Sequence, residues 1–220
     1  MKHFTKNFFN SYFKRFSLIV VLLFIYIVIC AFSYVNAVSA NIQDSVFRLH
    51  VIANSDSSED QSLKYIVRDK VLEYVNSISN NSSSKDEIIS LVKENINQIQ
   101  KVAEQTIYEN GYTYDVKLNI GNFAFPTKTY GDISFPAGFY DALKIEIGEA
   151  KGQNWWCVMF PPLCFVDVTS GIVSEESKNT IKENLSQEEY NLLSKNTEDI
   201  IFKFKIVEMF QSISIKLAHT

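Results

Sequence analysis

Few residues of this chain belong to the types that carry covalent catalysis. A serine or cysteine nucleophile needs a base within hydrogen-bond distance, and that base is most often histidine. Beyond residue 40 the chain has only His50 and His219. Cys157 and His50 are a conceivable thiol pair, but Cys157 lies in the apolar run Trp155–Phe160, where a thiolate is disfavoured. A structural thiol or a disulfide is therefore the favoured role for Cys157.

The carboxylates form no recognisable catalytic or metal-binding motif. Asp167 begins the run Asp-Val-Thr-Ser-Gly, yet aspartic-protease chemistry needs two such turns and the second copy is missing. His50, Asp56 and Asp60 have no second histidine nearby to complete a metal site, and Asp56 is better placed as a helix cap. No glycine-rich phosphate-binding loop is present. We therefore expect no catalytic residue, no metal and no small-molecule cofactor.

Polar and charged residues are concentrated around the first predicted strand and helix. The candidates for partner binding in this region are Arg48, His50, Asn54, Asp56, Asp60, Arg68 and Asp69. Asp60, Lys64 and Arg68 are spaced four apart on the helix, so Asp60 and Lys64 can pair and leave Arg68 free to reach back towards the turn. Two interpretations stay open: a structural salt-bridge network, or a surface that recognises a partner.

A second candidate surface is aromatic. Its residues are Tyr130, Tyr140, Trp155 and Trp156. Large rigid rings with a polar group are the side chains that most often anchor protein contacts. Adjacent tryptophans in a strand point to opposite faces, so at least one of them belongs to the core.

The first forty residues have the layout of a secretory signal. Basic residues precede an unbroken apolar run, Leu18–Phe32, and the small or polar stretch Ser33–Ala40 follows. Val38-Ser39-Ala40 offers a cleavage site, with Val35-Asn36-Ala37 as a second option. The apolar run has about fifteen residues, shorter than the ~20 of a spanning helix. Residues 1–40 are therefore predicted to be a cleaved signal peptide, with an uncleaved membrane anchor as the alternative.

The remaining residues, 41–220, are predicted to form a single acidic domain. They keep 17 basic and 25 acidic residues, because the first forty contain four basic and no acidic ones. This charge disfavours binding to nucleic acid or anionic lipid headgroups. Cys157 and Cys164 are the only cysteines in this part. In an exported chain they predict a disulfide, with two buried thiols on adjacent strands as the alternative.

A strand followed by two helices is predicted at the start of this domain. The segment Val46–Ala53 alternates and then becomes continuously apolar, as a strand entering a core does. Asp56 is predicted to cap the first helix, with Glu59 completing a capping box. Ser84 begins the second helix with the same pattern, and Asn110-Gly111 ends it.

The second half of the domain is predicted to be a sheet and further helices. Tyr112–Ile120 alternates as a strand with one solvent-exposed face, and Phe125–Asp141 is predicted to be a long loop because proline and glycine break both periods. Ala142–Gly148 and Trp155–Phe160 are predicted to pair as a hairpin.

The predicted C-terminal helices are Ser174–Asn184 and Ser186–Ser194, the latter with Glu189 at a capping-box position. The period of Ile200–Ile215 changes along its length, so its type stays open. The predicted fold class is α+β: an N-terminal signal or anchor helix, a strand, two helices, an antiparallel sheet with a hairpin, and C-terminal helices.

The sequence resembles the stage II sporulation protein R family, which signals from the forespore to the mother cell. The matching segments are Phe47–Asp56, Asp60–Leu72, Phe125–Tyr140, Leu143–Ala150 and Asn154–Asp167. The last is the most specific, since its Trp-Trp-Cys and Pro-Pro-Leu-Cys elements have no reason to recur together by chance. The resemblance does not extend to Ser77–Asp86 or to the residues after Gly171.

The resemblance implies a role in spore formation. A protein of this family is exported from the forespore into the space between the two apposed membranes. There it activates a membrane-embedded aspartic protease of the mother cell, which cleaves the inactive precursor of sigma factor E. The implied partners are this protease and the secretion machinery with its signal peptidase, and no nucleic acid.

Three hypotheses for the function remain. The first is a ligand that activates a membrane receptor, as the resemblance implies. The alternative is an envelope hydrolase acting on cell-wall or peptide bonds, with His50, Asp56 or Cys157 in its site. The third is a wall-associated structural module that uses exposed aromatic side chains.

Overall fold

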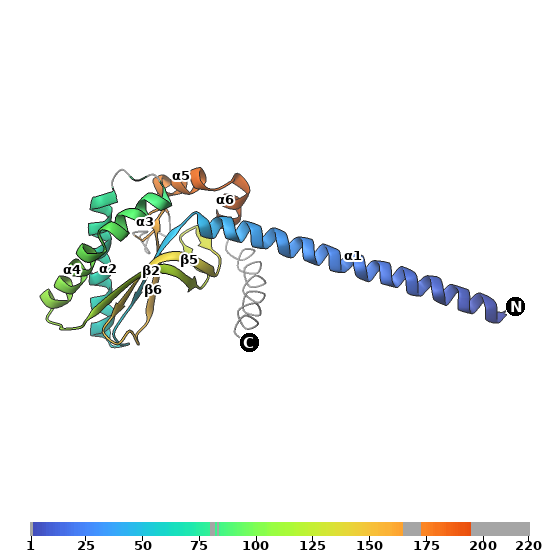
Figure 1. Cartoon of the computed structure of the whole chain (residues 1–220), viewed down its shortest axis with the longest axis horizontal. Helices are drawn as coiled ribbons and strands as arrows, with labels where there is room; N and C mark the ends of the chain where they lie inside the picture. Colours follow the sequence, from blue (N-terminus) through green and yellow to red (C-terminus); the bar gives the residue numbers. More distant parts are fainter. Residues whose placement is uncertain (1, 80–81, 83, 165–172, 195–220) are drawn as a thin grey trace. The chain divides into compact units, whose positions relative to one another are not determined.

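The computed structural model describes residues 2–79, 82, 84–164 and 173–194 of the chain. Two compact units are present, residues 1–40 and 41–220. The helix α1 (Lys2–Asp44) makes up the first unit and enters the second (Figure 1). Within α1, Phe13–Ala31 is long and apolar enough to cross a membrane, with 19 residues of mean hydropathy 2.4, and its side chains are exposed. This segment is compatible with a signal or a membrane anchor.

The second unit alternates helices and strands in an order close to the predicted one. Its elements are β1 (Phe47–Ile52), α2 (Ser58–Ser79), α3 (Lys85–Glu94), α4 (Ile96–Glu109), β2 (Val116–Phe125), β3 (Lys128–Tyr130), β4 (Ile133–Phe135), β5 (Gly138–Ile147), β6 (Asn154–Phe160), α5 (Glu175–Asn184) and α6 (Gln187–Ser194). The predicted α+β fold class is confirmed.

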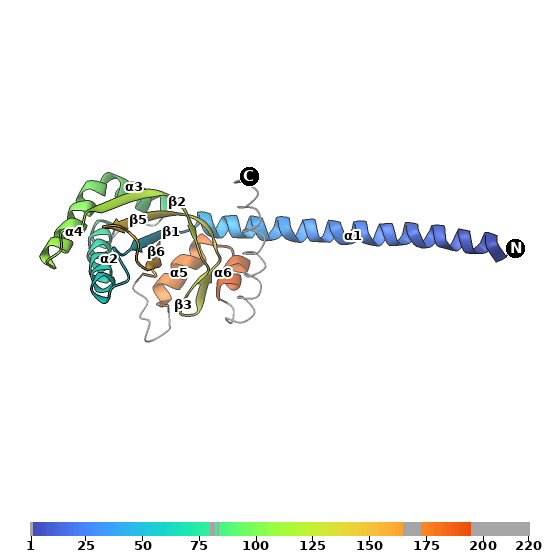
Figure 2. The ribbon, with the colours of Figure 1, turned by 90° about the horizontal axis from the view of Figure 1, so that it is seen from below.

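The main sheet is mixed and has β1 near its centre. Its strand order is β2-β5-β1-β6 (Figure 2), with β1 parallel to β5 and antiparallel to β6. The predicted hairpin of Ala142–Gly148 and Trp155–Phe160 is therefore wrong, because β1 lies between these strands. All six residues of β1 are buried, and a strand buried on both faces belongs inside a sheet. The connection after β5 spans the two strand spacings, about 10 Å, needed to pass β1.

A short hairpin stands where a loop was predicted. The strands β3 and β4 pair antiparallel, and Tyr130 faces Ile133 across a two-residue turn. Gly131 in that turn has φ +56°, a conformation that glycine adopts without steric cost. The strands β2 and β5 also reach into the predicted loop, where Phe125 faces Gly138. The predicted loop is therefore wrong over most of its length: Pro126, Gly131 and Pro136 lie between strands, and Gly138 begins β5.

One face of the sheet carries the helices α2, α3 and α4 (Figures 1 and 2). Alternate residues of a strand point to opposite faces, so Leu49 of β1 shares this face with Leu143 and Ile145 of β5. All are buried in one core with Val67 of α2 and Ile99 of α4. Each buried aliphatic side chain of this kind stabilises the fold by about 1.5–3 kcal/mol.

Capping explains most helix starts, with one correction. The first turn of α2 is capped by Ser57, whose Oγ accepts from the Asp60 amide at 3.2 Å, so the predicted cap at Asp56 is wrong by one residue. The predicted cap at Ser84 is confirmed by its bond from the Glu87 amide at 3.3 Å. The predicted second helix is two helices, α3 and α4, divided at Asn95.

The capping box predicted for α6 is confirmed. The Ser186 Oγ accepts from the Glu189 amide at 3.2 Å, and the Glu189 carboxylate accepts from the Ser186 amide at 2.8 Å. The predictions for Asp167 and for Ile200–Ile215 lie outside the described residues.

Cys157 and Cys164 are joined by a disulfide, and Cys30 in α1 is free and exposed. We predict that a maleimide labels the denatured full-length chain once without reductant and three times after reduction. Replacing both bonded cysteines by alanine should lower the free energy of unfolding by about 2–3 kcal/mol, because the small loop is no longer closed in the unfolded chain. Three labels without reductant would contradict the bridge; mass spectrometry and urea unfolding supply the readouts.

Candidate partner-binding site

The structure distributes the predicted binding residues over three places. The sheet face opposite α2–α4, here called the open face, carries Arg48, His50, Tyr140 and Trp156, with Tyr130 of β3 bonded to it. The turn between β1 and α2 holds Asn54 and Asp56, and Asp60 follows in the first turn of α2. The side of α2 next to β6 holds Arg68, Asp69 and Trp155. Only the first group brings residues from four strands together.

Arg48 is the centre of the open face. Its side chain is fully buried, and its Nη2 donates to the Tyr130 hydroxyl at 2.8 Å. The guanidinium carbon lies 4.2 Å from the ring centre of Phe125 and 4.7 Å from that of Tyr140. Its Nη1 has no hydrogen-bond partner, and no carboxylate among the described residues forms an ion pair with Arg48. A positive charge is therefore enclosed by aromatic rings.

This arrangement is costly in free energy. Arginine stays protonated, and removing its charge from water costs several kcal/mol. A desolvated contact with an aromatic ring returns about 2 kcal/mol. Apolar side chains in place of buried ionic groups are often neutral or stabilising. Stability alone therefore does not account for an arginine at position 48, which marks this cluster as the candidate site.

The two tyrosines at Arg48 are neutral hydrogen-bonding groups. Burial raises the pKa of Tyr140 far above its ordinary value, and its hydroxyl donates to the Pro136 carbonyl at 2.7 Å. Burial also raises the pKa of Tyr130 and outweighs the opposing effect of the Arg48 charge. The Tyr130 hydroxyl donates in turn to the Trp156 carbonyl at 3.0 Å. A chain of bonds thus joins β1, the β3–β4 hairpin and β6.

The hairpin is also held from its other side. Asp132 in its turn pairs with Lys178 of α5 at 2.8 Å, and Ser177 donates to the Pro162 carbonyl at 2.9 Å. The helix α5 therefore fixes both the hairpin and the loop that the disulfide closes.

His50 lies two residues further along β1 on the same face. Its ring stacks on Trp156 with a centroid distance of 3.6 Å, and its Nε2 lies 2.7 Å from the Asn154 Oδ1. Burial lowers its pKa to about 4, so the ring is neutral at pH 7 and Nε2 is the donor to the amide oxygen. A histidine in this state positions Trp156, and it is a weak general base near neutral pH.

Half-exposed side chains surround the buried side chains of Arg48 and His50. They are Phe123, Lys144, Glu146 and Trp156, with Asn119 and Asn154 more exposed. Lys144 and Glu146 pair at 2.6 Å, and Asn119 donates to the same carboxylate at 3.4 Å. Aromatic rings beside satisfied polar groups suit a contact with another protein.

The residues of the β1–α2 turn have a structural role. The Asp60 carboxylate accepts from Asn54 at 2.8 Å and from Ser55 at 2.6 Å, and Asn54 accepts from the Glu149 amide at 2.9 Å. Burial alone would raise the pKa of Asp60, but these hydrogen bonds outweigh it and lower the pKa. Gly148, at φ +57°, has no room for a Cβ against Asn54. The network joins this turn to the β5–β6 connection, and Asp56 beside it is exposed.

The predicted Asp60–Lys64 pair is wrong. Asp60 is occupied by the turn, and the buried Lys64 ammonium donates to the Gln153 carbonyl at 3.1 Å. Arg68 does not reach back to the turn either. It pairs with Asp69 at 2.7 Å and lies 4.4 Å from the Trp155 ring, on the helix side of the sheet. Trp155 and Trp156 thus point to opposite faces as predicted, and both are half-buried.

Sequence reasoning missed Phe125 and Phe135, whose rings face the Arg48 guanidinium, and Asn154, the partner of His50. Phe125 and Phe135 were assigned to a loop, where no period marks a side chain as inward. Asn154 carries no signal because its role depends on the pairing of β6 with β1.

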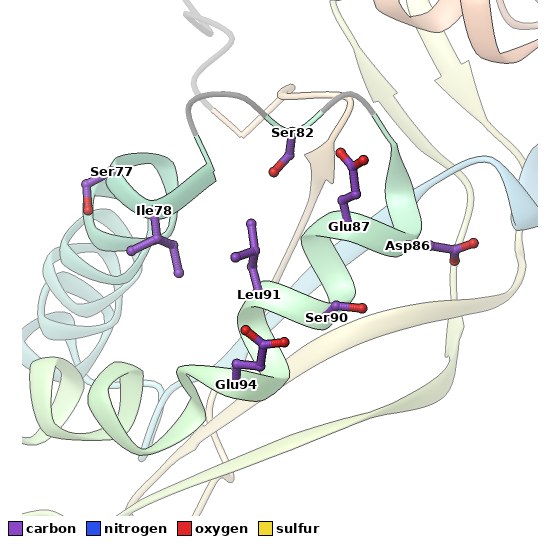
Figure 3. A pocket seen from close by; sticks show the side chains of 8 residues that line it. All are labelled: Ser77, Ile78, Ser82, Asp86, Glu87, Ser90, Leu91 and Glu94. Carbon is purple, nitrogen blue, oxygen red and sulfur yellow. The ribbon is translucent and has the colours of Figure 1, made fainter.

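A cavity of about 770 Å³ lies apart from these residues, between the end of α2 and α3 (Figure 3). Serines and acidic side chains line it, with Ile78 and Leu91. None of the predicted binding residues lines it. Within the described ranges no three histidine, cysteine or acidic side chains come together as metal ligands.

Comparison with known proteins agrees with the resemblance found in the sequence. Residues 43–170 match the family described as stage II sporulation protein R. The chain belongs to the stage II sporulation protein R family. The matched region contains the strands β1–β6, the helices α2–α4 and the disulfide, and therefore the described residues of the open face.

One relative is the stage II sporulation protein R of Bacillus subtilis (strain 168), which is 36% identical over 138 residues. The alignment covers 63% of this chain and 62% of that protein, so the chain spans less than two thirds of its relative's length. No solved structure matches the chain significantly.

The buried His50 predicts how stability depends on pH. Its folded pKa, about 4, lies below the ordinary 6.5, so the unfolded chain binds a proton first as the pH falls. Its contribution is complete above pH 6.5 and is lost as the pH falls towards 4. The loss should be about 1–3 kcal/mol. Urea unfolding across this range should show a smaller slope for His50→Gln; equal slopes would contradict a neutral buried ring.

Proposed function

We propose that this chain is an exported signalling protein that activates a membrane-embedded aspartic protease of the mother cell, which then processes the precursor of sigma factor E. The observation that carries the proposal is family membership over residues 43–170, the region that holds the Arg48 cluster. What the family does in spore formation is thereby extended to this chain.

Three properties of the chain support an extracytoplasmic role. The segment Phe13–Ala31 suits an export signal or an anchor, and both would deliver residues 41–220 to the far side of a membrane. The Cys157–Cys164 bridge suits an oxidising compartment. The excess of acidic residues favours a protein partner over nucleic acid or anionic lipid.

The open face supports binding better than hydrolysis. His50 is bonded to an amide, and the sulfur of Cys157 is in a disulfide, so neither the thiol nor a carboxylate-oriented histidine is offered to a substrate. A ligand switches a receptor only by binding its active state more tightly than its inactive state. The half-exposed rings of Phe123 and Trp156 lie beside the buried Arg48 cluster, and Tyr130 and His50 hold Trp156 in place. A surface held in one arrangement suits such selective binding.

Co-expression in a non-sporulating host tests the proposal. The full chain, the candidate membrane protease and the sigma precursor are expressed together, and an immunoblot detects the shortened sigma factor. We expect cleavage that requires both the protease and export, because receptor and ligand meet outside the cytoplasm. A chain lacking residues 2–40 is the export control, and a protease with its catalytic aspartate replaced is the second control. Cleavage of equal extent without export, or without this chain, would contradict the proposal.

A further inference from the structure

The two edge strands of the main sheet, β6 and β2, differ in whether their outward backbone groups are hydrogen-bonded within the chain. At the β6 edge, the Val158 carbonyl accepts from the Leu163 amide at 3.0 Å, and the Trp156 carbonyl accepts from Tyr130 at 3.0 Å. The disulfide-closed loop and the β3–β4 hairpin therefore occupy the backbone acceptors along this edge. A further strand cannot pair there without displacing them.

The β2 edge is long and regular. The strand pairs with β5 over all ten of its residues without a register shift, and it is the outermost strand of the sheet (Figure 2). The Gly148 amide donates to the Asp115 carbonyl at 2.8 Å, just before β2, which shows that odd-numbered residues bond to β5. In an antiparallel pair the backbone groups alternate in direction, so the even-numbered residues of β2 face outwards.

The outward groups of β2 are mostly free within the described part of the chain. Gln100 of α4 donates to the Val116 carbonyl at 3.4 Å, in agreement with this alternation. No described strand pairs with the outward backbone groups of Leu118, Ile120, Asn122 and Ala124. Natural sheets usually protect such an edge with a short strand, a bulge, a proline or a charged side chain, above all lysine. The ten residues of β2 contain no proline or bulge, and Lys117 is their one charged side chain.

The charge of this edge is opposite to that of the domain. The strand β2 contains Lys117 and no acidic residue, with Asp115 directly before it, whereas residues 41–220 have 25 acidic and 17 basic residues. Glu146 faces Lys117 across the strands, but its carboxylate is paired with Lys144 at 2.6 Å. Lys117 is exposed and has no ionic partner among the described residues. The β2 edge therefore favours an acidic segment.

From these observations we infer that the outer edge of β2 binds an extended, acidic segment of a partner protein as a fifth strand of the sheet. Backbone hydrogen bonds to Leu118, Ile120 and Asn122 provide affinity, and the charge of Lys117 favours acidic side chains. A second copy of this chain fits less well, because pairing two β2 edges brings lysines together without an acidic residue in either strand. That the partner is the protease rests on the proposed function, whereas the binding of an acidic strand by the β2 edge does not.

Hydrogen exchange measured by NMR tests the edge directly. The full chain in detergent micelles is mixed with a ten-residue peptide of alternating valine and glutamate, and separately with its valine–lysine counterpart. We expect the acidic peptide to slow exchange of the Leu118, Ile120 and Asn122 amides by about tenfold or more, and the basic peptide to have little effect. The inward amides of Asn119 and Gly121 are internal controls, since they already bond to β5. Equal effects of the two peptides, or none, would overturn the inference.

The dependence of amide protection on the chain concentration tests whether a second copy of this chain binds the β2 edge. If these amides become protected without peptide as the chain concentration rises, and light scattering shows a doubled mass, the edge binds a second copy. That result would overturn the assignment to a partner segment.

Two pairs of variants carry the test into the co-expression assay. Asn122→Pro removes an outward amide at a position where an edge strand tolerates proline, and Asn122→Ala removes the same side chain but keeps the amide. Processing with the proline variant should be about tenfold below that with the alanine variant at equal chain levels. Lys117→Glu should lower processing. Lys70→Glu, an equal change of charge at an exposed position of α2, should not.

Equal processing by Asn122→Pro and Asn122→Ala would overturn the inference and leave the proposed function standing. If the wild-type chain itself drives no processing, the proposed function fails, and hydrogen exchange with the peptides still decides whether the edge binds an acidic strand.

Discussion

The buried guanidinium of Arg48 is the constraint around which the open face is built. A charge removed from water needs compensation, and here hydroxyl and carbonyl oxygens and aromatic rings supply it in place of a carboxylate. Each of these groups comes from a different segment: Tyr130 from the hairpin, Phe125 from the end of β2, and Tyr140 from β5. Arg48 of β1 therefore contacts β2, β5, β6 and the hairpin at one point.

The sheet order makes this arrangement possible. Since β1 lies between β5 and β6, its residues Arg48 and His50 have neighbours on both sides, Tyr140 of β5 and Trp156 of β6, and both side chains are buried. The opposite face of β1 fills the helix-side core with Leu49 and Val51. One strand thus serves stability on one face and the candidate site on the other. The network of Asn54 and Asp60 then holds the turn after β1 against the β5–β6 connection.

Local signals in the sequence predicted where helices and strands lie along the chain better than which strands lie side by side. The helix starts at Ser84 and Ser186 were readable because a cap is decided within four residues. The pairing of β5 with β1 could not be predicted in this way, because about ninety residues separate Arg48 from its partner Ala142. The hydrophobic periodicity of a strand does not indicate which strand it pairs with. For the same reason Arg48 and Tyr130 were both candidates, but their bond was not foreseen. Asp60 was a candidate for partner binding because of its charge; its hydrogen bonds to Asn54 and Ser55, which the sequence did not predict, show that it also holds the turn before α2.

Under the proposed function, Arg48 is retained for signalling and not for stability. The direct measurement compares Arg48→Met with the wild-type chain in urea unfolding and in the processing of the sigma precursor. An apolar side chain of similar length should change the free energy of unfolding by less than about 1 kcal/mol, or raise it. Processing should fall about tenfold, because Tyr130 loses the hydrogen bond from the Arg48 guanidinium and keeps only its bond to the Trp156 carbonyl. A loss of about 3 kcal/mol or more in stability would make Arg48 a structural residue. Full processing by the variant would contradict the claim outright.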